Sequence, residues 1–138
     1  MWSWIPDLSD PGIAGEFAEH IGLRFTELSE DLAVATWTAG THLHQPHGIV
    51  HGGVHSSVVE TLASTGASVW LGERGRVVGV NNNTDFYRAV SEGSLTSTAT
   101  PLHRGRLQQV WVVETVIDAT GKLASRGQVR LQNLYQEA

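Results

Sequence analysis

The chain has 138 residues, a formal net charge of −5 and no cysteine. This length predicts a single domain with a buried core. The missing cysteines exclude a disulfide framework and thiol chemistry, and the acidic balance disfavours nucleic acid as a partner. The sequence contains no continuously apolar stretch of membrane-spanning length, and its N-terminus lacks the basic start and apolar run of a signal peptide. We therefore expect a cytoplasmic protein that does not enter a membrane.

The first 40 residues predict a short helix followed by a hairpin. Trp2 and Trp4 are expected to pack onto the body of the protein or onto a neighbouring subunit. Residues 12–20 indicate a short helix, and alternating apolar residues predict strands at 21–28 and 32–39.

A segment at 45–71 combines a loop rich in His, Gly and Pro with a helix-length stretch. Apolar residues recur at the helical period in the second part. The run of small residues at 63–68 is a poor helix former, which indicates that a sheet or another helix approaches closely there. The apolar stripe consists of Val54, Val58, Leu62 and Val69, widened by Val59, Ala63 and Trp70.

The remainder of the chain predicts β-strands. Residues 77–87 begin as a strong strand, but the polar run at 81–85 allows two interpretations: a strand that runs out into a loop, or a polar edge at a subunit interface or pocket mouth. Further strands are expected at 94–102, 106–117 and 122–134. In the second of these, Leu107, Gln109, Trp111, Val113 and Ile117 are expected to share one face. About six strands and one long helix predict an α+β fold whose sheet wraps around that helix.

Glu60 is the only acid in the long helix, and it shares a face with Ser64, four positions later. A glutamate in the middle of a helix is usually a solvated surface residue. Here, however, the helix begins at Gly52, where backbone N–H groups are free to bind an oxyanion or a carbonyl. Gln45 and His51 precede it closely. A carbonyl-polarising donor, an acid/base group and orienting side chains are the components of acyl transfer.

The spacing within the helix places these components apart. Gly52 and Glu60 are eight positions apart, which corresponds to about 12 Å at the helical rise. A carbonyl bound by the Gly52 amide therefore lies beyond the reach of Glu60 in the same chain. If both act on one bond, the site lies at a dimer interface.

The pattern QPHGIVHGGVHSSVVETLAS, followed by VVGVNNN and PLHRGR, resembles the hotdog-fold acyl-CoA thioesterases of the PaaI-like group. It is most similar to the branch of the Arthrobacter-type 4-hydroxybenzoyl-CoA thioesterase and of the menaquinone- and enterobactin-pathway thioesterases. The resemblance covers about residues 20–134. It implies one hotdog domain over 1–138, with a short N-terminal arm at 1–20 and an antiparallel sheet curved around one helix. It also implies homodimers with shared sites, commonly paired into homotetramers.

The resemblance also implies residue roles. Glu60 matches the catalytic carboxylate, acting as nucleophile or as general base on water, and Gly52 matches the amide that polarises the thioester carbonyl. Gln45 and His51 match residues that orient the thioester and the water, and Ser64 matches the hydroxyl that supports the attacking group. Many PaaI-like members carry Asn and Asp at the positions of Gln45 and Glu60, so this combination favours an aryl-CoA substrate. No cofactor is implied, because CoA is part of the substrate.

A CoA ester carries phosphates, so an acidic protein is expected to provide a local basic cluster for them. Arg88, Arg104 and Arg106 are the candidates, and the alternative is that each is an ordinary solvated arginine.

Three other functions compete with hydrolysis. His47, His51 and His55 have the spacing of metal ligands on one helical face, but the intervening glycines disfavour a continuous helix there, and we expect no metal site. His42, His44 and His55 are instead expected to be polar or packing residues.

A domain that binds acyl-CoA without hydrolysing it would not need Glu60. The hydratase branch of the fold usually carries an acid and a histidine five positions apart at the helix start, and this sequence has no such pair.

Overall fold

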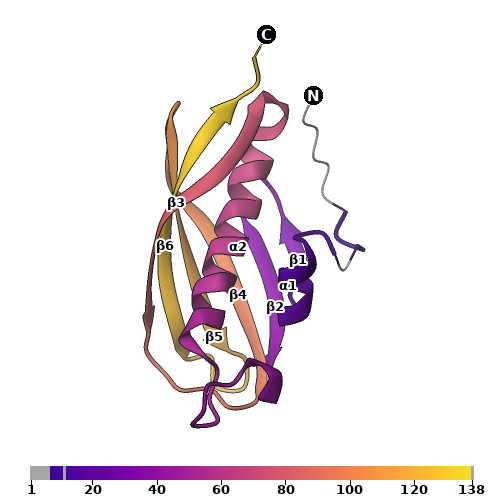
Figure 1. The fold of residues 1–138 in the computed structure, drawn as a ribbon, viewed down its shortest axis with the longest axis vertical. Coiled ribbons are helices and arrows are strands. Elements are labelled where there is room, and N and C mark those ends of the chain that lie inside the picture. Colours follow the sequence, from indigo (N-terminus) through magenta and orange to yellow (C-terminus); the bar gives the residue numbers. More distant parts are fainter. Residues whose placement is uncertain (1–6, 11, 138) are drawn as a thin grey trace.

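The computed structural model describes residues 7–10 and 12–137, and Trp2 and Trp4 lie outside this range. One long helix, α2 (Gly52–Leu71), lies against a six-stranded sheet that curves around it (Figure 1). This confirms the α+β hotdog fold expected from the sequence. No helix within the described residues is long and apolar enough to cross a bilayer.

The other elements lie close to the predicted ranges. They are α1 (Glu16–Ile21), β1 (Arg24–Leu28), β2 (Ala33–Ala39), a 3₁₀ turn η1 (Thr41–Leu43), a second 3₁₀ turn η2 (Gly72–Arg74), β3 (Gly75–Phe86), β4 (Gly93–Arg104), β5 (Gln108–Ile117) and β6 (Leu123–Tyr135).

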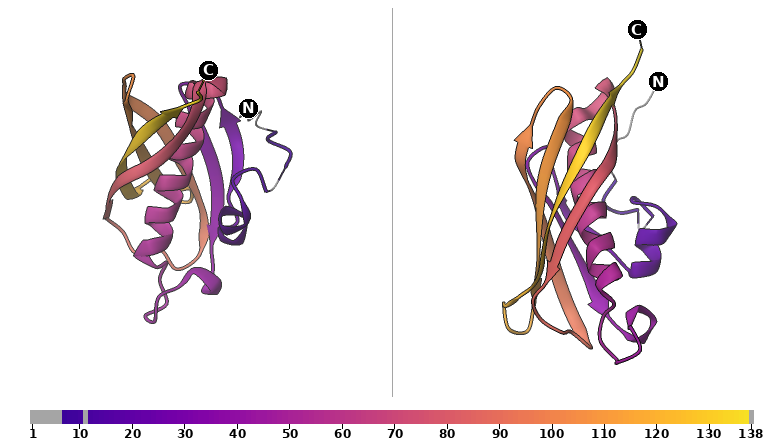
Figure 2. Two further views of the ribbon diagram at one scale, coloured as in Figure 1. Left: turned by 45° about the horizontal axis from the view of Figure 1, so that its top comes forward. Right: turned by 60° about the vertical axis from the view of Figure 1, so that its left-hand side comes forward.

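The strand order is β1-β2-β4-β5-β6-β3, and every neighbouring pair is antiparallel. The sheet therefore ends in two edges, β1 on one side and β3 on the other. Figure 2 shows α2 covering one face of the sheet, with α1 beside α2 and farther from the sheet. The N-terminus of α2 lies at the same end of the sheet as the β3–β4 connection.

The inward face of α2 forms the centre of the core. Val58, Leu62 and Ala63 of the predicted stripe are fully buried, whereas Val69 and Trp70 near the helix end are only partly buried. The small residues at 63–68 allow the sheet to approach the helix closely, as expected. A Cβ added to Gly66 would lie 2.7 Å from a ring carbon of Trp111, so the helix can approach this tryptophan only with glycine there.

The polar run at 81–85 belongs to β3 and is fully paired with β6, from Asn81 opposite Arg130 to Asp85 opposite Arg126. The interpretation of this run as a loop is therefore wrong. A bulge between Gly79 and Asn81 shifts the register at this point. Tertiary pairing overrides the low strand propensity of asparagine, and the outer edge of β3 has no partner strand within the described chain.

Two local predictions need correction. The strand expected from residue 21 begins at Arg24, because Gly22 adopts a positive φ of 89° and caps a helix that includes Ile21. Leu107 does not share the buried face of Gln109 and Trp111. It lies in the β4–β5 connection before β5 begins, and it is 53% exposed.

Candidate active site

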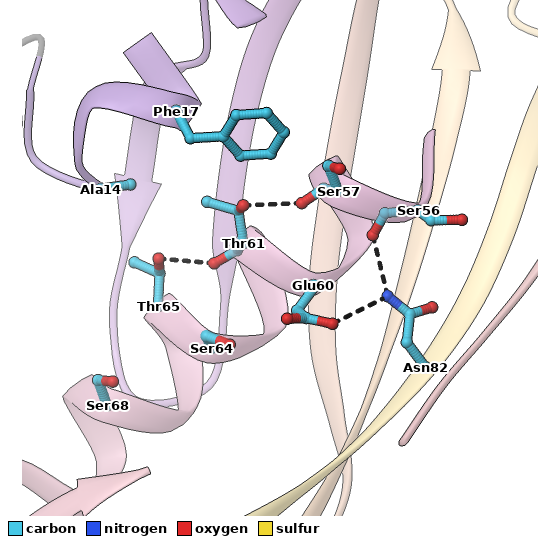
Figure 3. A pocket seen from close by; sticks show the side chains of 10 residues that line it. All are labelled: Ala14, Phe17, Ser56, Ser57, Glu60, Thr61, Ser64, Thr65, Ser68 and Asn82. Atoms are coloured by element: carbon cyan, nitrogen blue, oxygen red, sulfur yellow. Dashed lines mark hydrogen bonds between the residues drawn. The ribbon is translucent and has the colours of Figure 1, made fainter. Parts of the chain in front are cut away.

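The outward face of α2 carries small polar side chains and forms the floor of a groove of about 400 Å³ (Figure 3). We call it the helix groove. α1 and the segment before it border one side, and β3 borders the other. Its lining residues are Ala14, Phe17, Ser56, Ser57, Glu60, Thr61, Ser64, Thr65, Ser68 and Asn82.

Glu60 is exposed in the helix groove and is approached from β3 by a single side chain, that of Asn82. The Asn82 amide nitrogen donates to the backbone oxygen of Ser56 at 2.9 Å and, more weakly, to Oε1 of Glu60 at 3.4 Å. The Thr84 hydroxyl donates to Asn82 Oδ1 at 2.7 Å, which fixes the orientation of the amide. Asn82 therefore presents a donor to one carboxylate oxygen, and the other oxygen remains open to the groove.

The hydroxyl groups along the groove fall into two classes. Ser57, Thr61 and Thr65 each donate to a backbone carbonyl one turn earlier, at 2.6, 2.7 and 2.7 Å, so their hydroxyl protons are already used. The side-chain hydroxyls of Ser64 and Ser68 make no hydrogen bond to any described residue, and these two residues continue the row that starts at Glu60 (Figure 3). Within the described residues, the Ser64 hydroxyl is thus unpaired, and Ser64 lies one helical turn from Glu60.

Gln45 and Gly52 line a separate cavity of about 350 Å³ at the N-terminus of α2, which we call the loop cavity. The Gln45 side-chain oxygen accepts a hydrogen bond from the His47 amide and holds the loop in a tight turn. The Gly52 amide is one of the helix-start donors and bonds to no described residue. A Cβ on Gly52 would lie 2.7 Å from the Phe86 ring, so any larger residue here would displace this partly exposed ring.

His51 is the N-cap of α2, and its Nδ1 accepts a hydrogen bond from the Gly53 amide at 2.7 Å. The ring proton of neutral His51 therefore lies on Nε2. The ring borders a third cavity of about 360 Å³, the histidine cavity, together with His20 and His42. His51 thus stands beside the helix groove rather than in the loop cavity with Gln45.

Residues 47–124 match the family model described as the thioesterase superfamily. The match covers more than half of the chain. The chain belongs to the thioesterase superfamily.

Known relatives agree with this membership. The chain is 36% identical over 108 residues to the proofreading thioesterase EntH of Cronobacter turicensis, covering 78% of each protein. Among solved structures, AziG of S. sahachiroi is 56% identical with a TM-score of 0.87, covering 89% of this chain and 99% of that one. The thioesterase HI1161 of Haemophilus influenzae is 29% identical with a TM-score of 0.87, covering 97% of this chain and 94% of that one. The protein is a thioester hydrolase.

The three arginines considered for CoA do not form one cluster within the chain of this thioesterase. Arg88 lines the loop cavity and donates to the Leu123 carbonyl at 2.7 Å. Arg104 and Arg106 lie at the opposite end of β4, roughly 35 Å away along a strand of this length. Arg104 is held by Asp31 at 2.9 Å, so its guanidinium is already paired.

The histidines of the thioesterase loop do not lie on one helix. α2 begins at Gly52, so His47 remains in the loop, His51 caps the helix and His55 is buried in its first turn. Within residues 7–10 and 12–137, no group of three or more His, Cys, Asp or Glu side chains is arranged to hold a metal ion. His55 packs between the rings of Trp37 and Phe86 and has the packing role expected of it.

The structure thus brings Glu60 together with Ser64, and Gln45 together with Gly52, but it keeps the two pairs in different cavities. The sequence did not single out Asn82 as a site residue. One of the two interpretations of the polar run at 81–85, which includes Asn82, was a polar edge at a subunit interface or pocket mouth. Phe17 was also missed, and its only signal was an apolar residue in the short N-terminal helix.

Proposed function

We propose that this thioesterase hydrolyses an acyl-CoA, with an aryl acyl group favoured, at a site that two copies of the chain complete together. The observation that supports this most directly is the separation of Gly52 and Glu60. They lie on one straight helix, eight positions or about 12 Å apart, and line different cavities. A single chain therefore cannot apply both groups to one thioester.

The free edge of β3 supports such a pairing. β3 is twelve residues long, and Val78 and Val80 on it are 40% and 48% exposed. A long exposed edge strand with apolar side chains is a template for pairing with another strand. Gly79 and Asn82 of this strand adjoin Glu60, so a copy paired along β3 would approach the helix groove from that side. Two such dimers are expected to associate further into a homotetramer.

In the proposed reaction, one copy of the chain contributes Gly52 and the other contributes Glu60. The thioester carbonyl oxygen accepts a hydrogen bond from the Gly52 amide, where the N-terminus of α2 favours developing negative charge. Glu60 of the second copy either attacks the carbonyl carbon or takes a proton from the attacking water. The carbon–sulfur bond then breaks, and CoA leaves as a thiolate that takes up a proton. If water attacked, the free acid forms directly; if Glu60 attacked, the acyl group remains on Glu60 as a mixed anhydride, and a water then hydrolyses this anhydride to release the acid and restore the carboxylate. Gln45 and His51 orient the thioester and the water, and Ser64 supports the attacking group.

In the bound substrate, the CoA part is expected to extend from the thioester past the loop cavity. Arg88 lies in this cavity with Gln45 and Gly52, which makes it the best-placed of the three arginines for a phosphate. Arg106 lines a separate cavity beside the β4–β5 connection and remains a candidate only if another subunit brings that end close.

The test is complementation between two inactive variants. Gln45→Ala and Glu60→Gln are expected to abolish most benzoyl-CoA hydrolysis when each is purified alone. Co-refolded in equal amounts, they should regain roughly a quarter of wild-type activity, because half of the dimers are mixed and each mixed dimer has one intact site. A mixture no more active than its components would contradict the shared site.

A non-catalytic acyl-CoA-binding protein is the alternative function within this fold. A panel of benzoyl-, hydroxybenzoyl- and fatty acyl-CoA esters separates the two, with released thiol as the readout. Tight binding of these esters without thiol release by the wild-type protein would favour the binder.

A further inference from the structure

Phe17 is an aromatic residue that the fold does not bury. Its side chain is 64% exposed, although it lies on α1, whose inward residues Ala18 and Ile21 are 4% and 2% exposed. Figure 3 shows the ring reaching from α1 toward Ser57 and Thr61 of α2. Exposure of a single apolar residue is common, but Phe17 also lines the groove that contains Glu60, and this placement points to a role in binding.

The ring stands between two cavities. Phe17 lines both the helix groove that contains Glu60 and the histidine cavity that contains His51. Among the residues that the structure describes, Phe17 and Ser57 alone line both cavities. The Ser57 hydroxyl is held by the Gly53 carbonyl at 2.6 Å and stays close to the helix surface. The Phe17 ring is therefore the larger of the two side chains that border both cavities.

The two cavities offer different surfaces to a substrate. The helix groove, about 400 Å³, is floored by serine and threonine side chains, and the apolar residues among its described lining are Phe17 and Ala14. The histidine cavity, about 360 Å³, includes Ile21, Leu43 and Val54. A larger share of the lining is apolar in the histidine cavity than in the helix groove, so an alkyl chain there would desolvate fewer polar groups.

We propose that Phe17 is a specificity-determining residue that provides an aromatic wall for the acyl group and closes the helix groove against the histidine cavity. This rests on the proposed function, in which the acyl group is held next to Glu60. A planar aryl group stacks on the ring and fits within the groove. A long alkyl chain would have to pass the ring to reach the apolar surface behind it, so the wild-type protein selects aryl over long alkyl groups.

Truncation of Phe17 should reverse this preference. Phe17→Ala removes the aromatic wall and joins the two cavities, so kcat/KM should fall for benzoyl-CoA and rise for decanoyl-CoA. The ratio of the two values should change by about tenfold or more, since a change of one methylene in an apolar pocket already alters discrimination by that amount. Phe17→Trp keeps a ring at the partition and should retain the preference for benzoyl-CoA.

The matched control is Leu102→Ala. Leu102 is 65% exposed on β4, as exposed as Phe17, and lines neither cavity. It should leave the ratio unchanged. An unchanged ratio in Phe17→Ala, or an equal change for both substrates, would overturn the partition.

A binding measurement separates this inference from the proposed reaction. Dissociation constants for phenacyl-CoA and decyl-CoA, two thioethers that cannot be hydrolysed, should change in opposite directions in Phe17→Ala. If the wild-type protein released no thiol from any ester but Phe17→Ala still gained affinity for decyl-CoA alone, hydrolysis would be wrong and the partition would stand. If hydrolysis were present and both dissociation constants changed alike, the partition would be wrong and the reaction would stand.

Discussion

The inward and outward faces of α2 are both built from small residues, for opposite reasons. Inward, Gly66 leaves space that the Trp111 ring fills, and the two surfaces are in van der Waals contact. Outward, Ser64 and Ser68 leave space that no described residue fills, and this space is the helix groove. Small side chains on one face allow dense packing, and on the other face they leave room for a ligand.

This difference separates stability from activity along one helix. Changes to the inward face alter the contacts that fold the sheet onto α2, since a buried face tolerates neither added nor removed volume. Changes to the outward face alter groups that are already exposed, and surface substitutions of this kind usually shift stability little. Variants on the two faces should therefore differ in which measurement they affect.

The largest expected effect is on activity, from Glu60→Gln. Loss of a positioned acid/base group typically lowers the rate by about 10²–10⁴-fold, and kcat for benzoyl-CoA should fall within this range. The melting temperature should hardly change, because Glu60 is exposed and its one side-chain hydrogen bond is 3.4 Å long. Glu114→Gln, which alters an exposed glutamate on β5, is the control and should keep full activity. Comparable turnover by Glu60→Gln would remove Glu60 from the mechanism.

The second prediction tests the inward face through Gly66→Val. The new Cβ would begin 2.7 Å from Trp111, so the ring and the sheet behind it must move. We expect a loss of about 1–3 kcal/mol in the free energy of unfolding, the usual cost of overpacking a core, measured by urea denaturation. Ser68→Ala on the outward face is the matched control and should be neutral or slightly stabilising, because alanine is the better helix former. Equal stabilities for the two variants would mean that the faces do not differ in packing.

The sequence predicts this helix and its neighbours well, because its signals are local and periodic. The stripe from Val58 to Leu62 recurs at the helical period, and the glycines at 52 and 72 mark where α2 begins and ends. The polar run in β3 was ambiguous because its strand character comes from pairing with β6, which is distant in sequence. Leu107 was misplaced for a related reason, since a short connection between strands carries no period.

The candidate site could be predicted only in part. The separation of Gly52 from Glu60 follows from the helical rise and therefore from the sequence alone. The contact of Asn82 with Glu60 does not, because it depends on the register of β3 and on the bulge that precedes Asn81. The position of Phe17 beside the groove could not be predicted either, because it depends on how α1 packs against α2, and no local sequence pattern encodes that packing.

A third prediction tests how far β3 supports the outward face. Asn82→Ala removes the donor to Glu60 Oε1 and to the Ser56 carbonyl. We expect kcat to fall roughly tenfold, comparable with the loss of one hydrogen bond, while KM changes less. Asn83→Ala is the matched control, since Asn83 is the next residue of β3 and makes neither contact. Equal kcat values for Asn82→Ala and Asn83→Ala would mean that Glu60 is well positioned without Asn82.

The smallest expected effect concerns His55, the buried polar residue in the first turn of α2. Burial lowers the pKa of His55 below its ordinary value of 6.5. Its Nδ1 has no partner among the described residues, and its ring packs on Trp37 and Phe86, with Arg88 the charged residue that lines the same cavity. The unfolded chain therefore binds a proton at this residue at a higher pH than the folded chain does.

The pH dependence of stability follows from this order of protonation. Above about pH 6.5 both states are neutral at His55 and the residue adds no pH dependence. As the pH falls below this value, protonation of the unfolded state lowers the free energy of unfolding until the lowered folded-state pKa is reached. His55→Leu should flatten this part of the urea-denaturation profile between pH 8 and pH 5, whereas His47→Leu, an exposed loop variant, should retain it. An identical decline in His55→Leu and the wild-type protein would show that the acid sensitivity of the fold originates elsewhere, and that the helix start tolerates a charge as readily as its outward face does.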